Sequence, residues 1–287
     1  MASGNMKDIK RRIKSVESTM QITKAMQLVA SSKLRKAKER ADKARPFFNA
    51  LYETMCEIQA ENKNFLSPYT VKRNGSGKHL LVVIAGDRGL AGGFNSSILK
   101  LAQARVDELG KENVKILAIG KKSAEYFEKR SFDMANTYLN IAEGIKIHVA
   151  GILAEDILNP YLKGEVSEVE LFYTEYVSPI LQQAVSKPVL PVELRTDIVT
   201  TKALPVYEPS AGEVFDSIVP KYVTGMVFGA ITDSFASEQA ARRNAMENAS
   251  DNAEEMISDL SLKYNRARQA SITQELTEIV SGSSAQE

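Results

Sequence analysis

The sequence predicts a mixed α/β protein in which two very long terminal helices flank an α/β domain. Residues 5–45 and residues 230–281 contain neither Gly nor Pro, so both stretches lack the residues that usually end a helix. At the usual helical rise, the second stretch alone would be about 78 Å long, more than a compact domain needs. Between the two stretches, β-branched apolar runs alternate with amphipathic segments, as in an α/β domain.

An apolar repeat of about 3.5 residues runs along the N-terminal stretch. Alternate steps of four and three residues lead from Ile9 to Ile58, and only Thr23 and Gln27 on this path are polar. The repeat predicts a left-handed supercoil with a partner helix. Pro46 removes one helical hydrogen bond, but the repeat keeps its phase beyond it, so we expect a kink there.

Small residues mark the predicted seam of the C-terminal stretch. The seam residues are Ala236, Ala240, Ala241, Ala245, Ala249, Ala253, Met256, Leu260, Tyr264 and Ala267. Small side chains let two helix axes approach closely. On the N-terminal stretch, four apolar residues beside the seam would suit a second neighbour: Ile22, Ala25, Met26 and Val29.

The two stretches carry opposite charge. Residues 1–45 contain thirteen Lys or Arg and four Asp or Glu, whereas residues 246–287 contain three and eight. This asymmetry favours pairing of the two stretches with each other over pairing of identical copies. An antiparallel coiled coil within one chain is the simplest arrangement, and pairing between separate molecules is the alternative.

The middle of the chain predicts a Rossmann-like domain with a mainly parallel sheet. We expect buried strands at His79–Ala85 and Val114–Ile119, an alternating strand at Glu168–Tyr176, and an edge strand or hairpin within Pro179–Leu194. We expect helices at Ser96–Leu109, Lys121–Arg130 and Ile147–Leu162.

A glycine-rich loop, Gly86–Asn95, follows the first predicted strand, where α/β folds often bind phosphate. Its spacing matches neither the P-loop nor the dinucleotide-binding pattern, and Asp87 places negative charge where a phosphate would lie. We therefore interpret the loop as a structural turn.

Other chemistry-bearing patterns are sparse. His79 and His148 are the only histidines and Cys56 is the only cysteine, so the sequence favours neither a metal site nor an internal disulfide. Glu254 and Glu255 suit a solvated helix face better than acid–base catalysis. The net charge of +1 does not indicate nucleic-acid binding. No uninterrupted apolar stretch approaches the length that a membrane-spanning helix needs.

The segment Arg268–Ala285, RQASITQELTEIVSGSSA, resembles the C-terminal signature of the gamma subunit of the bacterial rotary F-type ATP synthase. Five residues match that signature in register: Ile272, Thr273, Glu275, Glu278 and Gly282. Ser283 replaces the alanine of the pattern, a change between small residues. Three further stretches agree with the family, namely Ile22–Ala37, Asp87–Asn95 and Ser237–Ala253.

The resemblance implies the central rotor shaft of an ion-translocating ATP synthase, without catalytic residues or cofactors of its own. Implied partners are three alpha and three beta subunits, the epsilon subunit and the membrane c ring. The implied division is a coiled-coil helix in residues 1–66, a Rossmann-like domain in 67–208, and a second coiled-coil helix in 209–287. The chain would lie, as a peripheral protein without its own membrane span, at the cytoplasmic face of the bacterial plasma membrane.

The resemblance also implies roles for individual residues. Contacts to the beta subunits are expected at Lys24, Met26, Lys33, Arg35, Lys36, Arg268, Gln269 and Thr273. An apolar shaft tip is expected at Ile272, Leu276, Ile279 and Val280, and a foot on the c ring at Tyr207 and Glu208. Two alternatives to the rotor remain: a coiled-coil scaffold, and a nucleotide-binding α/β enzyme with helical arms. The sequence does not distinguish proton from sodium as the coupling ion.

Overall fold

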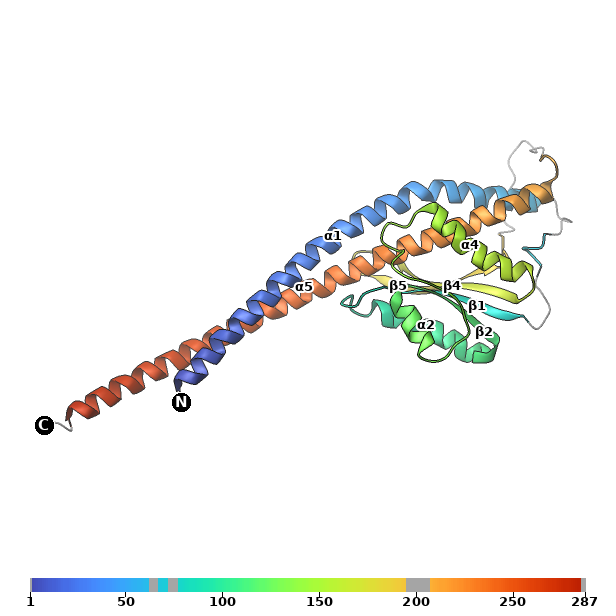
Figure 1. Ribbon diagram of the computed structural model, residues 1–287. Coiled ribbons are helices and arrows are strands. Elements are labelled where there is room, and N and C mark those ends of the chain that lie inside the picture. Colours follow the sequence, from blue (N-terminus) through green and yellow to red (C-terminus); the bar gives the residue numbers. More distant parts are fainter. Residues whose placement is uncertain (1, 62–66, 72–76, 195–206, 285–287) are drawn as a thin grey trace. The chain divides into compact units, whose positions relative to one another are not determined.

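The computed structural model describes residues 2–61, 67–71, 77–194 and 207–284. The chain divides into two compact units, one formed by Met1–Ala30 with Arg243–Glu287 and the other by Ser31–Arg242. Two long helices, α1 (Ala2–Glu61) and α5 (Ala211–Ser284), contribute to both units. The predicted long terminal helices are therefore confirmed (Figure 1).

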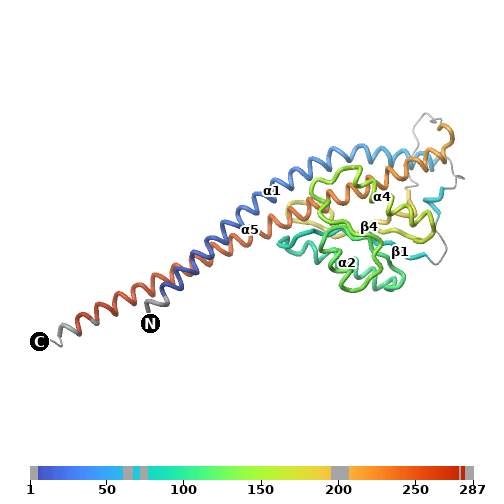
Figure 2. Tube along the Cα trace, in the orientation of Figure 1, coloured from blue at the N-terminus to red at the C-terminus, as the bar shows by residue number. Residues whose placement is uncertain are grey.

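The first unit consists of the two outer helix segments, which lie side by side with α5 extending beyond the start of α1 (Figures 1 and 2). The predicted seam of α1 is confirmed, because every one of its positions from Ile9 to Ala30 is buried or half-buried. On α5, Ala253 and Leu260 are buried as expected. The prediction for Met256 is wrong: its side chain is 45% exposed, because the half-buried Ile257 takes the seam position.

A pair of hydroxyl groups interrupts this seam. Thr23 Oγ1 lies 2.6 Å from Ser250 Oγ, and both residues are buried. Each hydroxyl also lies within hydrogen-bond distance of a carbonyl in its own helix, Met20 for Thr23 and Met246 for Ser250. A polar contact at one seam position can fix the register of a coiled coil. If the helices slid along each other, both hydroxyl groups would stay buried but would lose their mutual hydrogen bond. This accounts for the polar residue at position 23.

Thr23→Val should destabilise the first unit by about 1 kcal/mol, the usual net contribution of one buried hydrogen bond. In a double-mutant cycle with Ser250→Ala, the two losses should be non-additive, since both remove the same contact. Denaturant unfolding measures both effects. Thr19→Val is the matched control, because the Thr19 hydroxyl is exposed and bonds only to Ser15 of its own helix. Equal costs for the two valine variants would contradict a register contact.

The second unit contains a five-stranded sheet with the order β3-β2-β1-β4-β5. Its strands are β1 (Lys78–Ile84), β2 (Val114–Ile119), β3 (Met134–Tyr138), β4 (Val166–Tyr176) and β5 (Gln182–Leu190). Only the β4–β5 pair is antiparallel, so the predicted mainly parallel sheet is confirmed. The sequence did not reveal β3, a five-residue strand at the sheet edge with mostly half-buried side chains.

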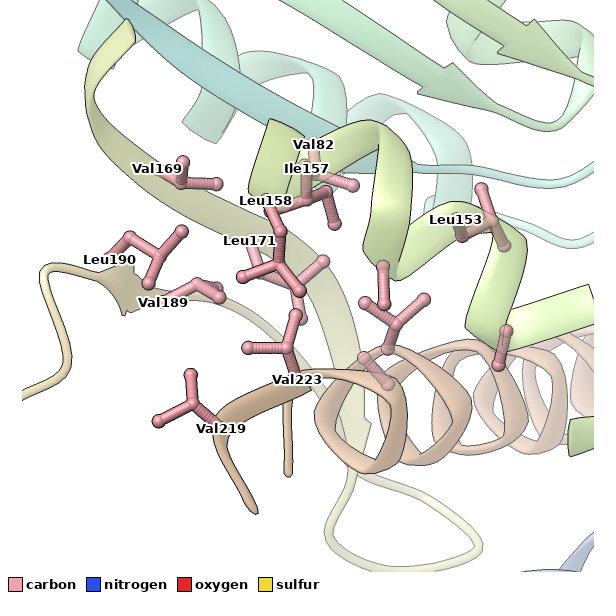
Figure 3. Packing of buried hydrophobic residues seen from close by; sticks show 14 of the residues in the cluster. Val82, Leu153, Ile157, Leu158, Val169, Leu171, Val189, Leu190, Val219 and Val223 are labelled. Atoms are coloured by element: carbon pink, nitrogen blue, oxygen red, sulfur yellow. The ribbon is translucent and has the colours of Figure 1, made fainter. Parts of the chain in front are cut away.

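Helices cover both faces of the sheet. Successive residues of β1 alternate between two cores: Leu81 and Val83 pack with α2 (Phe94–Leu109) and α3 (Lys121–Glu128), and Val82 packs with α4 (Ile147–Leu162) and α5. A short 3-10 turn, Lys111–Asn113, joins α2 to β2. Figure 3 shows the core between the sheet, α4 and α5, in which Val82, Ile157 and Val223 come from three different elements. Because the sheet is covered on both sides, β4 is buried at four consecutive residues, Leu171–Thr174, and does not alternate there as predicted.

The N-terminal part of α5 supplies a continuous apolar stripe to this core. Its residues are spaced by four and are completely buried: Phe215, Val219, Val223, Val227 and Ile231. Among the described residues, α5 is the one helix long and apolar enough to pass a length-and-composition test for a membrane span, and half of its most apolar window is buried within the protein. The packing against the sheet accounts for that apolarity.

Helix α1 lies beside α5 in this unit and runs antiparallel to it, with Phe48 near Phe228 and Tyr52 stacked on Tyr222. The helix continues through Pro46. Figure 1 shows it curving over this region, where we expected a kink. A proline that removes one backbone donor allows such a bend without ending the helix.

Two glycines of α5 differ in their surroundings and provide a matched test. A Cβ at Gly225 would clash with the Phe48 ring, whereas a Cβ at Gly229 would meet no atom within 4 Å. Gly225→Ala should therefore destabilise the second unit by about 1–3 kcal/mol through overpacking. Gly229→Ala should stabilise it by about 0.5–1 kcal/mol through helix propensity. Thermal unfolding of both variants checks this, and shifts of the same sign would contradict the packing of Phe48 on Gly225.

Candidate functional site

The carboxyl ends of the parallel strands are joined by one carboxylate. Asp87 Oδ1, in the loop after β1, accepts hydrogen bonds from the backbone N–H groups of Lys121 and Asn140, both at 3.0 Å. Lys121 is the first residue of α3, and Asn140 follows β3. An anion at a helix N-terminus is favourable, and here the protein supplies its own. This geometry agrees with the structural turn that we inferred from the sequence.

Asn95 holds the same loop in a strained conformation. Its Oδ1 accepts from the Gly86 N–H at 2.8 Å, and its Nδ2 donates to the Arg88 carbonyl at 3.3 Å. Leu90 has a backbone φ angle of 61°, which residues other than glycine rarely adopt, and the residue is 66% exposed. Strain of this kind persists when surrounding contacts fix it and often marks a functional surface. Sequence reasoning missed Arg88 and Leu90 as surface candidates, although a leucine between glycines in a polar loop was a visible signal.

A buried ion pair within α5 holds the arginine that contacts this loop. Arg242 Nη2 lies 2.6 Å from Glu238 Oε1, and these side chains are only 10% and 8% exposed. The same guanidinium donates to the Gly89 carbonyl at 3.1 Å. A side chain at Gly86 would press on the Glu238 carboxylate, so glycine permits the close approach. Burial raises the pKa of Glu238, and the charge of Arg242 opposes this rise.

The basic band predicted on α1 divides into two parts. Lys33 Nζ lies 2.7 Å from Glu143 Oε1, so its charge pairs within the unit with the loop that precedes α4. Arg35 and Lys36 are exposed, and Arg35 is only loosely paired with Glu39 at 3.9 Å. The part of the band that remains open to another molecule is therefore Arg35 and Lys36.

In the first unit, the predicted contact residues lie on exposed helix faces. Lys24 is exposed and Met26 is half-buried on α1, while Arg268 and Gln269 are exposed on α5. Thr273 is also exposed, and its hydroxyl donates to the carbonyl of Gln269. The α5 group lies about 27 Å along the helix from Ser250, the neighbour of Thr23, so the structure separates the predicted contacts into two groups.

The predicted shaft tip is apolar and exposed. Exposed fractions are 49% for Ile272, 58% for Leu276, 68% for Ile279 and 64% for Val280. These residues therefore do not pack into the seam of the unit. Contiguous exposed apolar residues mark a surface for another molecule.

At the other end of α5, Tyr207 packs against the core of the second unit and Glu208 is exposed. The helix then begins at Ala211 because Ser210 Oγ accepts from the N–H of Glu213, an N-cap contact. Of the two predicted foot residues, Glu208 is the one whose side chain is open to solvent. Within the described part of the chain, no group of three or more His, Cys, Asp or Glu residues could hold a metal ion.

Comparisons with known proteins match this architecture over the whole chain. A family model described as ATP synthase matches residues 5–286. The ATP synthase gamma chain of Ruminococcus albus is 55% identical over 282 residues, which cover 97% of this chain and 98% of that one. The chain belongs to the ATP synthase gamma family. This confirms the resemblance seen in the C-terminal signature.

Three further comparisons extend the result. The gamma chain of Acetobacterium woodii, described as sodium ion specific, is 39% identical and covers 98% of both chains. The central stalk and c ring structure of Tetrahymena thermophila mitochondrial ATP synthase contains a chain that is 26% identical, with a TM-score of 0.61, covering 80% of this chain and 99% of that one. A rotor chain of the Euglena gracilis mitochondrial enzyme shares the fold at 18% identity, with a TM-score of 0.68 and coverage of 94% and 99%. The gamma-family protein described here is thus a central-stalk subunit of a rotary ATP synthase.

Proposed function

We propose that this chain is the rotor shaft that couples ion flow through a membrane c ring to ATP synthesis or hydrolysis in a hexamer of three alpha and three beta subunits. The observation that supports this most strongly is the last part of α5, which buries Ser271 but exposes Arg268 and Gln269 beside four apolar residues. Such an end suits a shaft that turns in an apolar sleeve and makes a few directional contacts.

The shaft needs no catalytic group for this role. One asymmetric helix pair cannot contact three identical catalytic subunits in the same way, so its angle favours a different nucleotide state in each. The coupling is a free-energy difference between remote sites that acts through contacts alone. The carboxylate of Asp87 accepts a hydrogen bond at the N-terminus of α3, where a phosphate would otherwise bind. This argues against the alternative of a nucleotide-binding enzyme.

We assign the contacts as follows. Residues 1–66 and 209–287 form the shaft, and residues 67–208 form the domain at its foot. Arg268, Gln269 and Thr273, near the C-terminal end of α5, form one contact with the beta subunits. In the first unit, Lys24 and Met26 are further contacts with the beta subunits. In the second unit, the open charges of Arg35 and Lys36 and the exposed Arg88 and Leu90 are offered to the same subunits.

Glu208 is the foot residue that faces the c ring, and Tyr207 holds that segment on the core. The epsilon subunit is a further partner of the foot domain. The assembled complex would lie at the cytoplasmic face of the bacterial plasma membrane, with this chain as a peripheral subunit.

Reconstitution tests the proposal. The purified chain is mixed with alpha and beta subunits of the same organism, and complex formation and ATPase activity are measured. We expect a stable complex whose ATPase activity differs several-fold from that of the alpha and beta subunits alone. A chain that ends after Ser271 serves as the comparison: it should still assemble and should transmit less torque. Failure of the full chain to join the complex would exclude the rotor function and leave the scaffold alternative.

A further inference from the structure

A cavity of about 530 Å³ lies within the second unit, between α1, α5 and the strands β4 and β5. Aromatic residues and glycine line it: Phe48 comes from α1, Phe228 and Gly229 from α5, and Tyr173 from β4. Gly229 leaves the α5 backbone open to the space, because nothing lies within 4 Å of the position that its Cβ would take. The volume is in the range that binds small organic molecules.

Two carboxylates line the cavity, that of Glu175 on β4, which lies 3.8 Å from Lys187 Nζ, and that of Asp233 on α5. The backbone N–H of Tyr176 donates to Asp233, but a carboxylate has about four lone-pair sites, so one donor leaves most of its capacity unused. Burial raises the pKa of Asp233, and the nearby Glu175 acts in the same direction, while Arg45 and Lys187 oppose the rise. Arg45 and Lys187 thus act on Asp233 through their charges, while the ion pairs that they form are with Asp42 and Glu175.

The two cations that line the cavity already have acidic neighbours. Lys187 Nζ lies 3.8 Å from Glu175 Oε1 and 5.3 Å from the centre of the Tyr173 ring. Arg45 Nη2 lies 3.8 Å from Asp42 Oδ1, and the Arg45 side chain is 65% exposed. A cation that entered the cavity would meet Asp233 without displacing either contact.

We propose that this cavity binds an amphipathic organic cation, with its ammonium group paired with Asp233 and its apolar body against Phe48 and Phe228. The ammonium would supply the hydrogen bonds that one backbone donor leaves unmade, and a charge-assisted pair is stronger than a neutral one. The aromatic walls favour the same ligand, because ring faces attract a cation and bury hydrocarbon. An anionic ligand of the same shape would face the Asp233 carboxylate.

Three probes of one shape test the charge preference: 4-phenylbutylamine, 4-phenylbutanol and 4-phenylbutanoate. Their affinities for the purified full-length chain are measured by ligand-observed NMR and calorimetry. We expect the amine to bind about tenfold more tightly than the alcohol, as one charge-assisted contact would give, and the carboxylate to bind most weakly. Asp233→Asn should reduce the amine affinity to that of the alcohol. Glu155→Gln, which removes an exposed carboxylate of α4, should leave all three affinities unchanged.

Gly229→Leu should fill the cavity and abolish binding of all three probes. If that variant does not fold, the comparison of amine with alcohol and the isosteric Asp233→Asn variant still decide the question. Equal affinity for the three probes, no binding at millimolar concentration, or unchanged amine binding by Asp233→Asn would each overturn the proposal. The test uses the chain alone, so its outcome does not depend on the rotor function.

Discussion

Arg242→Ala should lower the stability of the Ser31–Arg242 unit by about 3–5 kcal/mol, the usual cost of removing one partner of a buried ion pair. The variant leaves Glu238 buried beside Gly86 without its cation, and it also removes the donor to the Gly89 carbonyl. Thermal or denaturant unfolding of the isolated chain measures the loss. The β1–α2 loop should then lose its attachment to α5.

The loss should also depend on pH in a definite direction. Burial raises the folded-state pKa of Glu238 above its unfolded value, and removing Arg242 raises it further. A raised pKa means that the folded state binds the proton more tightly, so the stabilising effect of protonation is present at low pH and is lost as the pH rises through the folded pKa. Arg242→Ala should therefore be less damaging at mildly acidic pH than at neutral pH.

Lys78→Ala provides the matched control, because the Lys78–Asp133 pair lies in the same unit but is partly exposed. An exposed pair contributes only about 0–1 kcal/mol. Equal losses for the two variants, or a loss for Arg242→Ala that does not change with pH, would contradict a structural role for the buried pair.

Arg268→Ala combined with Gln269→Ala should slow ATP turnover by the reconstituted complex about tenfold or more, since hydrogen bonds to charged groups contribute about 1.5–3 kcal/mol. The unfolding of the isolated chain should not change, because both side chains are exposed. Removing the tip from Ile279 onward should lower torque only gradually, because each apolar contact proposed there would be weak.

The matched control is Lys263→Ala combined with Arg266→Ala, which removes two exposed side chains from the same helix. This control should leave turnover within about twofold of the unchanged chain, since surface pairs contribute little. If both double variants slow turnover equally, general loss of polar surface explains the effect and the assigned contact is wrong.

Periodicity predicted the parts of the fold that repeat. The seam from Ile9 to Ile58 is confirmed at every position, including the polar Thr23 and Gln27, because a 3.5-residue pattern depends only on local helix geometry. The buried strands β1 and β2 and helix α4 were also visible, since continuous apolar runs and helical spacing are local signals. Met256 was misplaced because an apolar residue one position from the seam fits the composition equally well.

The ties between distant segments were not predictable. Asp87 with Asn140, Gly89 with Arg242, and Thr23 with Ser250 join residues far apart in sequence, and no local pattern specifies such pairs. The short edge strand β3 also gave no signal, because its half-buried side chains do not separate clearly into two faces. The contact residues carried over from the family signature lie mostly on exposed faces, which suits the proposed role, whereas Lys33 pairs with Glu143 of the same chain.

Direct observation of rotation tests the central claim. A fluorescent probe is attached to the thiol of the Glu208→Cys variant, at an exposed position. Cys56, the only native cysteine, is buried, so the probe reacts at position 208. The hexamer of alpha and beta subunits is fixed to a surface and ATP is added. The rotor account predicts rotation of the probe in one direction, with three pauses per turn that lengthen as ATP is diluted. A complex that hydrolyses ATP while the probe stays still or moves at random would contradict it.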